Sequence, residues 1–231
     1  MGYYRRRRRR TRVGLSLLLV FLCAVFLVSC AVGSGSSWFR SLLGIDVAAY
    51  RSEKTVAALP IDSAVSGELC ASVGMLTAGS VRLTEFHSAS DAVRIYRDEL
   101  LNALMRTNYS AYIGNNSLNA SISASYPHLN ASAVIPASDF ENAALRYFGA
   151  TSVSNKNGEL FSYLSRASCY VAPSQARALS VSVTPLSLEE TENTYRLTFS
   201  LENANGETAS YRAMFVKRPN GSAYMKLLEE I

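Results

Sequence analysis

Residues 195–215 read YRLTFSLENANGETASYRAMF, and the main sheet is predicted outward from this segment. Apolar and polar side chains alternate from Tyr195 to Leu201, which is typical of a strand with one buried face. Asn205-Gly206 is a strong signal for a tight hairpin turn. The alternation resumes from Tyr211 to Phe215, so the stretch predicts an antiparallel hairpin with one apolar face and one polar face.

The same period of two extends the hairpin in both directions. Upstream, Leu179, Val181 and Val183 alternate with small polar residues. Downstream, the turn Pro219-Asn220-Gly221 precedes a strand from Ala223 to Leu228, and a further strand is expected around Ala167 to Ala172. The C-terminal part therefore predicts an antiparallel meander of four or five strands.

Two helices are expected to cover the apolar face of this sheet. Residues 88–106 carry an apolar stripe at helical spacing, and Ser88 with Asp91 resembles a capping box. Residues 136–149 predict a second helix, with Ser138 as its cap and Gly149 as its stop. The stretches 69–73 and 80–86 are read as short strands. The fold class that follows is α+β.

This order of elements, helices first and a meander last, resembles the nuclear transport factor 2-like cone, in which a curved sheet wraps around helices. The segment 135–149, Ile-Pro-Ala-Ser-Asp-Phe-Glu through Tyr-Phe-Gly, looks like one found in uncharacterised anchored envelope domains of Gram-positive bacteria. The resemblance covers about residues 88–231 and is architectural. A cystatin-like layout, with one helix across a meander, is the alternative.

The N-terminus predicts membrane attachment. Arg5–Arg10 and Arg12 precede an apolar run from Val13 to Val28, and such a basic cluster stays on the cytoplasmic side while the rest is translocated. Leu27-Val28-Ser29-Cys30 resembles the lipobox of bacterial lipoproteins, which implies that Cys30 is diacylated and anchors the chain. An uncleaved helix and cleavage near residues 31–33 remain as alternatives.

These signals divide the chain into a signal or membrane anchor (1–30), a linker and approach segment (31–66) and an extracytoplasmic α+β domain (67–231). Seven of the 23 basic residues precede Val13, so the remainder carries 16 basic against 18 acidic residues. This near-neutral balance gives no reason to expect nucleic acid as a partner. Cys70 and Cys169 could form a disulfide in an oxidising compartment, or could be two buried thiols.

No nucleotide-binding, metalloprotease or hydrolase motif is present in the sequence. His87 and Asp91 are the pocket candidates, because a histidine beside a carboxylate can act in general acid–base chemistry. No metal ligand set or cofactor is expected. The interpretation is a non-catalytic binding or interaction module, held by its anchor at the membrane and facing an unknown envelope protein or small ligand. The alternatives are a cone-fold enzyme that uses a His–carboxylate pair, and a structural spacer.

Overall fold

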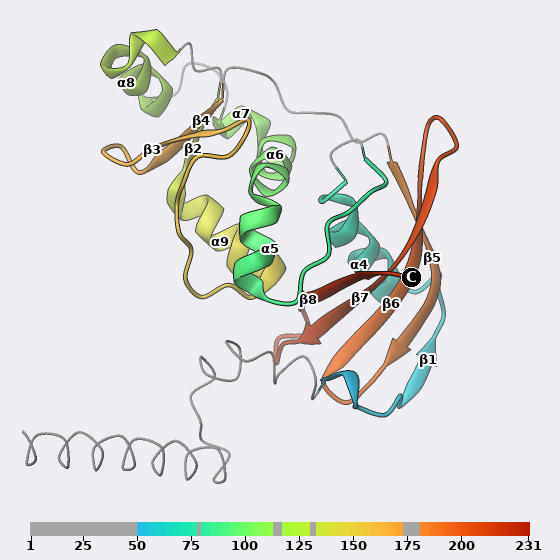
Figure 1. Ribbon diagram of the computed structural model, residues 1–231. Coiled ribbons are helices and arrows are strands. Elements are labelled where there is room, and N and C mark those ends of the chain that lie inside the picture. Colours follow the sequence, from blue (N-terminus) through green and yellow to red (C-terminus); the bar gives the residue numbers. More distant parts are fainter. Residues whose placement is uncertain (1–49, 78–79, 113–116, 130–132, 173–180) are drawn as a thin grey trace, which may run out of the picture. The chain divides into compact units, whose positions relative to one another are not determined.

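The computed structural model describes residues 50–77, 80–112, 117–129, 133–172 and 181–231. These residues form an α+β fold with two antiparallel sheets (Figure 1). The predicted anchor segment and Cys30 lie outside the described residues. Within the described ranges, no helix has both the length and the apolar character needed to cross a membrane.

The larger sheet has five strands in the order β1-β5-β6-β7-β8. Its strands are β1 (Ala57–Leu59), β5 (Val181–Glu190), β6 (Thr194–Asn203), β7 (Thr208–Lys217) and β8 (Ala223–Glu230). The meander predicted from the alternating pattern is confirmed as β5 to β8. Gly206 and Gly221 adopt positive φ angles of 78° and 83° in the two turns, a conformation that favours glycine.

The smaller sheet has the strand order β2-β4-β3. It consists of β2 (Ala133–Pro136), β3 (Ser162–Leu164) and β4 (Cys169–Ala172). The strand predicted around Ala167 to Ala172 exists as β4, but its partners are β2 and β3. The fifth place in the large sheet belongs to β1 instead.

The described residues contain six α-helices and one 3-10 turn, η1 (Pro127–Leu129), which follows the fifth of them. The helices are α4 (Ala64–Gly74), α5 (Ala89–Ile95), α6 (Arg97–Thr107), α7 (Tyr109–Tyr112), α8 (Ser117–Ser125) and α9 (Ala137–Phe148). Helix α4 packs on β5, and α9 packs on β8 (Figure 1). Leu197, Phe199 and Phe215 from the sheet are fully buried in one core cluster with Leu100, Phe140 and other helical residues. The helix-facing side of the sheet is therefore filled by apolar side chains.

Two local predictions for the N-terminal half are wrong. Residues 69–73 lie in helix α4, where Leu69 and Val73 are buried at a spacing of four and Ser63 caps the N-terminus through the Ser66 amide. A short apolar run such as this one fits either a strand or a buried helix. Residues 80–86 form no regular strand and make an isolated β-bridge to β8 at Phe86.

The single helix predicted for residues 88–106 is broken at Tyr96, which has φ −103° and ψ 27°. The Tyr96 hydroxyl donates a 2.6 Å hydrogen bond to the Thr84 carbonyl, so its side chain binds the backbone of the segment that precedes the helix. In α9, the residue at the N-cap is Pro136, and Ser138 lies inside the helix without capping it. The predicted stop is confirmed, since Gly149 has φ 67°.

The approach segment is also more structured than a linker. Of the stretch 31–66, residues 50–66 are described, and they provide β1 and the start of α4. The candidate disulfide is not formed, because Cys70 and Cys169 are free thiols. Cys70 packs against the main core, whereas Cys169 lies in a separate cluster with Ile122 and Val134.

Candidate functional site

Polar side chains form a row across the outer face of the large sheet, opposite the helices. Ser187 pairs with Thr198, Thr198 with Arg212, and Arg212 with Glu229. Successive side chains of a strand point to opposite faces, so these four side chains lie on the face opposite the core residues. A second row, two residues along each strand, holds Glu189, Arg196, Met214 and Leu227.

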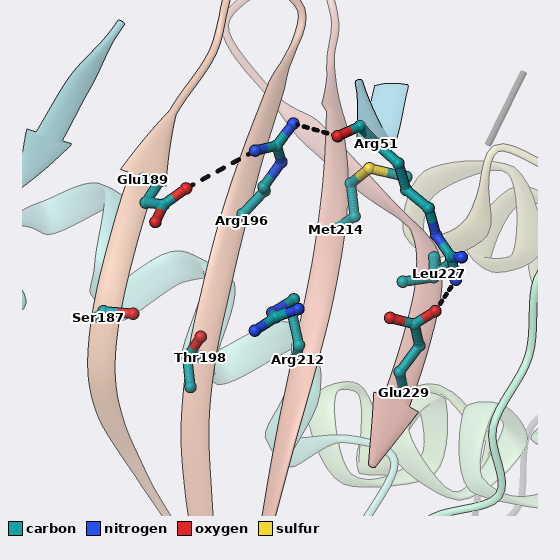
Figure 2. Close-up of a pocket in the computed structure, with 9 residues that line it drawn as sticks. All are labelled: Arg51, Ser187, Glu189, Arg196, Thr198, Arg212, Met214, Leu227 and Glu229. Atoms are coloured by element: carbon teal, nitrogen blue, oxygen red, sulfur yellow. Dashed lines mark hydrogen bonds and ion pairs between the residues drawn. The ribbon is translucent and has the colours of Figure 1, made fainter. Parts of the chain in front are cut away.

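These two rows and Arg51 line a depression of about 500 Å³ (Figure 2). The lining contains three arginines and two glutamates, which leaves one net positive charge. The lining residues come from five separate segments of the chain, and only the folded sheet brings them together. We call this open surface the outer depression.

Two of the three arginines are already engaged. Arg51 forms an ion pair with Glu229. Arg196 approaches Glu189 at 3.7 Å and also donates hydrogen bonds to the backbone carbonyls of Tyr50, Arg51 and Glu53, at 2.9, 3.1 and 2.6 Å. Figure 2 shows Arg51 directed to Glu229, and Arg196 directed to Glu189 and to Arg51.

Arg212 differs from them. Among the described residues, the guanidinium of Arg212 has neither an ion pair nor a hydrogen bond, and the same holds for the hydroxyls of Ser187 and Thr198. A guanidinium offers several donors in a fixed planar fork that matches a carboxylate or phosphate. A hydroxyl can donate one further hydrogen bond. The arrangement can therefore bind an oxyanion.

Met214 and Leu227 give the depression an apolar floor. Each is only 2% exposed, yet neither belongs to the two core clusters. The side chain of Arg51 runs past both on its way to Glu229 (Figure 2). The apolar stem of an arginine can cover such a surface while its charged end stays at the rim.

The entry segment of the domain, residues 50–59, is fixed at the edge of the depression. Arg196 holds its backbone, and Glu53 accepts hydrogen bonds from the Thr191 hydroxyl at 2.6 Å and from the Asn193 side chain at 2.8 Å. Burial raises the pKa of the Glu53 carboxyl, but these hydrogen bonds and the nearby Arg196 outweigh it and leave the pKa below its ordinary value of 4.5. We call residues 50–59 the strap.

The residues predicted from sequence lie elsewhere. His87 is exposed in the turn before α5, and Asp91 bonds to the Ser88 hydroxyl at 2.8 Å as part of the helix cap. Neither lines the outer depression. Burial raises the pKa of the Cys70 and Cys169 thiols, so both are poor nucleophiles.

Within the described residues, no group of three His, Cys, Asp or Glu side chains is placed to hold a metal ion. Comparison with family models, curated proteins and solved structures finds no match to this chain.

Proposed function

We propose that this chain is a membrane-anchored, extracytoplasmic binding module of a bacterial cell envelope. Its binding surface is the outer depression, and it carries out no catalysis. Part of this proposal is that the N-terminal segment is the anchor, lipidated at Cys30, and that the domain is a nuclear transport factor 2-like variant. Nucleic acid is not among the proposed partners.

The observation that carries the binding role is that Arg212 has no partner among the described residues and lies in a row with two hydroxyls that have none there either. Arg212 lies in a sheet in which the other two lining arginines are paired. A catalytic site of the cone type would need an open cavity between helices and sheet, and this space is filled by buried residues such as Phe199 and Phe215. His87 stands exposed outside the outer depression, which supports binding over acid–base chemistry.

Site-specific photo-cross-linking in the cells that express the full chain tests this role. A photoreactive residue at Thr198 is expected to give defined adducts that disappear when Arg212→Glu is added. The control places the same residue at Arg94, whose side chain is 70% exposed on α5 and remote from the sheet rows. If position 198 gives no more adduct than position 94, the domain is a spacer and the proposed binding role is wrong.

The anchor needs a separate measurement. Labelling with a radioactive fatty acid is expected to mark the wild-type chain and to be lost in Cys30→Ala. Unchanged labelling of the Cys30→Ala chain would contradict lipidation at this residue. Neither result affects the reading of the outer depression.

A further inference from the structure

We infer that the outer depression binds the C-terminal carboxylate of a peptide, with Arg212 and Thr198 holding the carboxylate and Ser187 holding the adjoining amide. This inference rests on the proposed binding role and specifies the ligand. It starts from the order of the side chains in the first row, in which Ser187, Thr198 and Arg212 are consecutive cross-strand partners.

Strand spacing assigns the roles. Neighbouring strands lie about 4.8 Å apart, so Thr198 and Arg212 can bind the two oxygens of one carboxylate. Ser187 is one strand farther, roughly 10 Å from Arg212, which is beyond the reach of the same carboxylate. A peptide that runs across the strands would place its last amide group near Ser187.

The charges of the depression select a single negative charge. Glu189 and Glu229 stand at opposite edges of the lining, on β5 and β8, and their pairing with Arg196 and Arg51 leaves too little positive charge to favour a polyphosphate or an anionic membrane surface. The net charge of the lining is one positive unit, which a monocarboxylate neutralises. Arg212 can accept it without breaking an existing pair, because Arg51 and Arg196 satisfy the two glutamates.

The apolar floor fits the same ligand. Met214 and Leu227 lie in the second row, one side-chain step of about 6.8 Å along the strands from Arg212 and Glu229. The Arg51 stem runs over Met214 and Leu227, so a small apolar side chain on the last residue of the peptide would contact this stem. A free inorganic anion would make no such apolar contact.

The test follows the side-chain Nε–Hε resonance of Arg212 by NMR in the full chain, labelled with ¹⁵N-arginine and held in detergent micelles. The resonance is identified by its absence from Arg212→Gln. The probes are N-acetyl-trialanine with a free C-terminus, the same peptide as its C-terminal amide, and inorganic phosphate. The free acid is expected to give a saturable shift, with the amide at least about tenfold weaker because a hydrogen bond to a charged group is lost.

A matched pair of variants isolates the Thr198 hydroxyl. Thr198→Val keeps the shape and the strand preference, and is expected to weaken binding of the free acid by about tenfold. Thr184→Val makes the same change on β5 outside the outer depression and is expected to leave binding unchanged. Equal effects of the two substitutions would remove Thr198 from the site.

The inference is overturned if the amide binds as well as the acid, or if phosphate binds more tightly than the acid. It is also overturned if the shift grows linearly with concentration and depends on ionic strength alone. If cross-linking at position 198 still depends on Arg212 while the free acid fails to bind, the binding surface stands and the carboxylate assignment falls.

Discussion

Replacing Arg196 by methionine should release the strap from the large sheet while the core stays folded. Arg196 is 18% exposed and holds three backbone carbonyls of residues 50–53 through one nitrogen. Methionine keeps an apolar stem in contact with the sheet but removes every donor. What is lost is therefore the attachment of the strap rather than the packing beneath it.

The size of the effect follows from the number of donors. One guanidinium nitrogen carries two hydrogens, so the three carbonyls share about two hydrogen bonds from a charged group. Such bonds are worth about 1.5–3 kcal/mol each, but two of these three are only part-buried and the third is exposed to water. We expect a local loss of roughly 2–3 kcal/mol, which corresponds to about a 30- to 160-fold change in an equilibrium constant.

Amide hydrogen exchange measures this loss directly. The Val56 amide donates a 2.7 Å hydrogen bond to the Glu190 carbonyl and should lose protection by this factor, whereas Phe199 amide protection in β6 should stay near the wild-type value. Arg94→Met on α5 is the matched control and should change neither. Equal protection of Val56 in Arg196→Met and wild type would refute the role assigned to Arg196.

Three further changes test other parts of the structure. In Gly158→Ala, the new methyl group overlaps the Asp98 carboxylate, which accepts hydrogen bonds from the Glu159 and Leu160 amides. Because these bonds would be displaced, the free energy of unfolding measured in urea should fall by roughly 2–4 kcal/mol. Glu53→Gln should flatten the acid limb of the stability profile, because the lowered pKa of Glu53 adds stability above pH 4.5 that is lost as pH falls through the folded-state value. Burial and a hydrogen bond to Asp139 raise the pKa of Tyr112 to about 12. The stability that Tyr112 contributes is therefore present below its ordinary pKa of 10 and is lost as the pH rises through about 12. This alkaline loss should be absent from Tyr112→Phe.

Each of these tests has its own contrary outcome. Gly67→Ala is the control for Gly158, because its methyl group meets nothing within 4 Å and should stabilise helix α4 by about 0.5–1 kcal/mol. Similar effects of the two alanines would disprove the overlap at Asp98. An acid profile of Glu53→Gln that is parallel to wild type, or an unchanged alkaline profile of Tyr112→Phe, would show that the respective hydrogen bonds are not formed in solution.

The parts of the fold that could be predicted are those in which local chemistry has one solution. An Asn-Gly pair between two alternating runs favours a tight hairpin, and β6 and β7 join at Gly206 as expected. Gly149 ends α9 for the same kind of reason, since its φ of 67° suits glycine. Neither feature depends on distant contacts.

The predictions fail where contacts with residues far along the chain determine the local structure. Strand β1 has only three residues and exists because the edge of β5 accepts it, a partner more than a hundred residues away. At the break, the Tyr96 hydroxyl binds the Thr84 carbonyl, a contact that a helical stripe cannot reveal. The 69–73 run is helical because α4 buries it against the sheet.

The outer depression could be foreseen only in part. Thr198 and Arg212 alternate with core residues, so sequence alone assigns them to the polar face. Ser187 could not be assigned in this way, because continuing the alternation of Val181 and Val183 would place residue 187 on the buried face. A bulge between Pro185 and Ser187 reverses the phase, so that Leu188 is buried and Ser187 joins the outer row.

This reversal also explains why the site and the strap occupy the same surface. After the bulge, β5 presents Glu189 to the outer face, where Arg196 reaches it while holding the backbone of the strap. The strap in turn delivers Arg51 to Glu229, and its stem lies along Met214 and Leu227. Two of the three positive charges in the lining are thus used to hold the chain in place. Arg212, which has no partner in the described part of the chain, remains to select a ligand. Substitution of Arg196 should therefore loosen the strap and alter the floor together, whereas substitution of Thr198 should change ligand affinity alone.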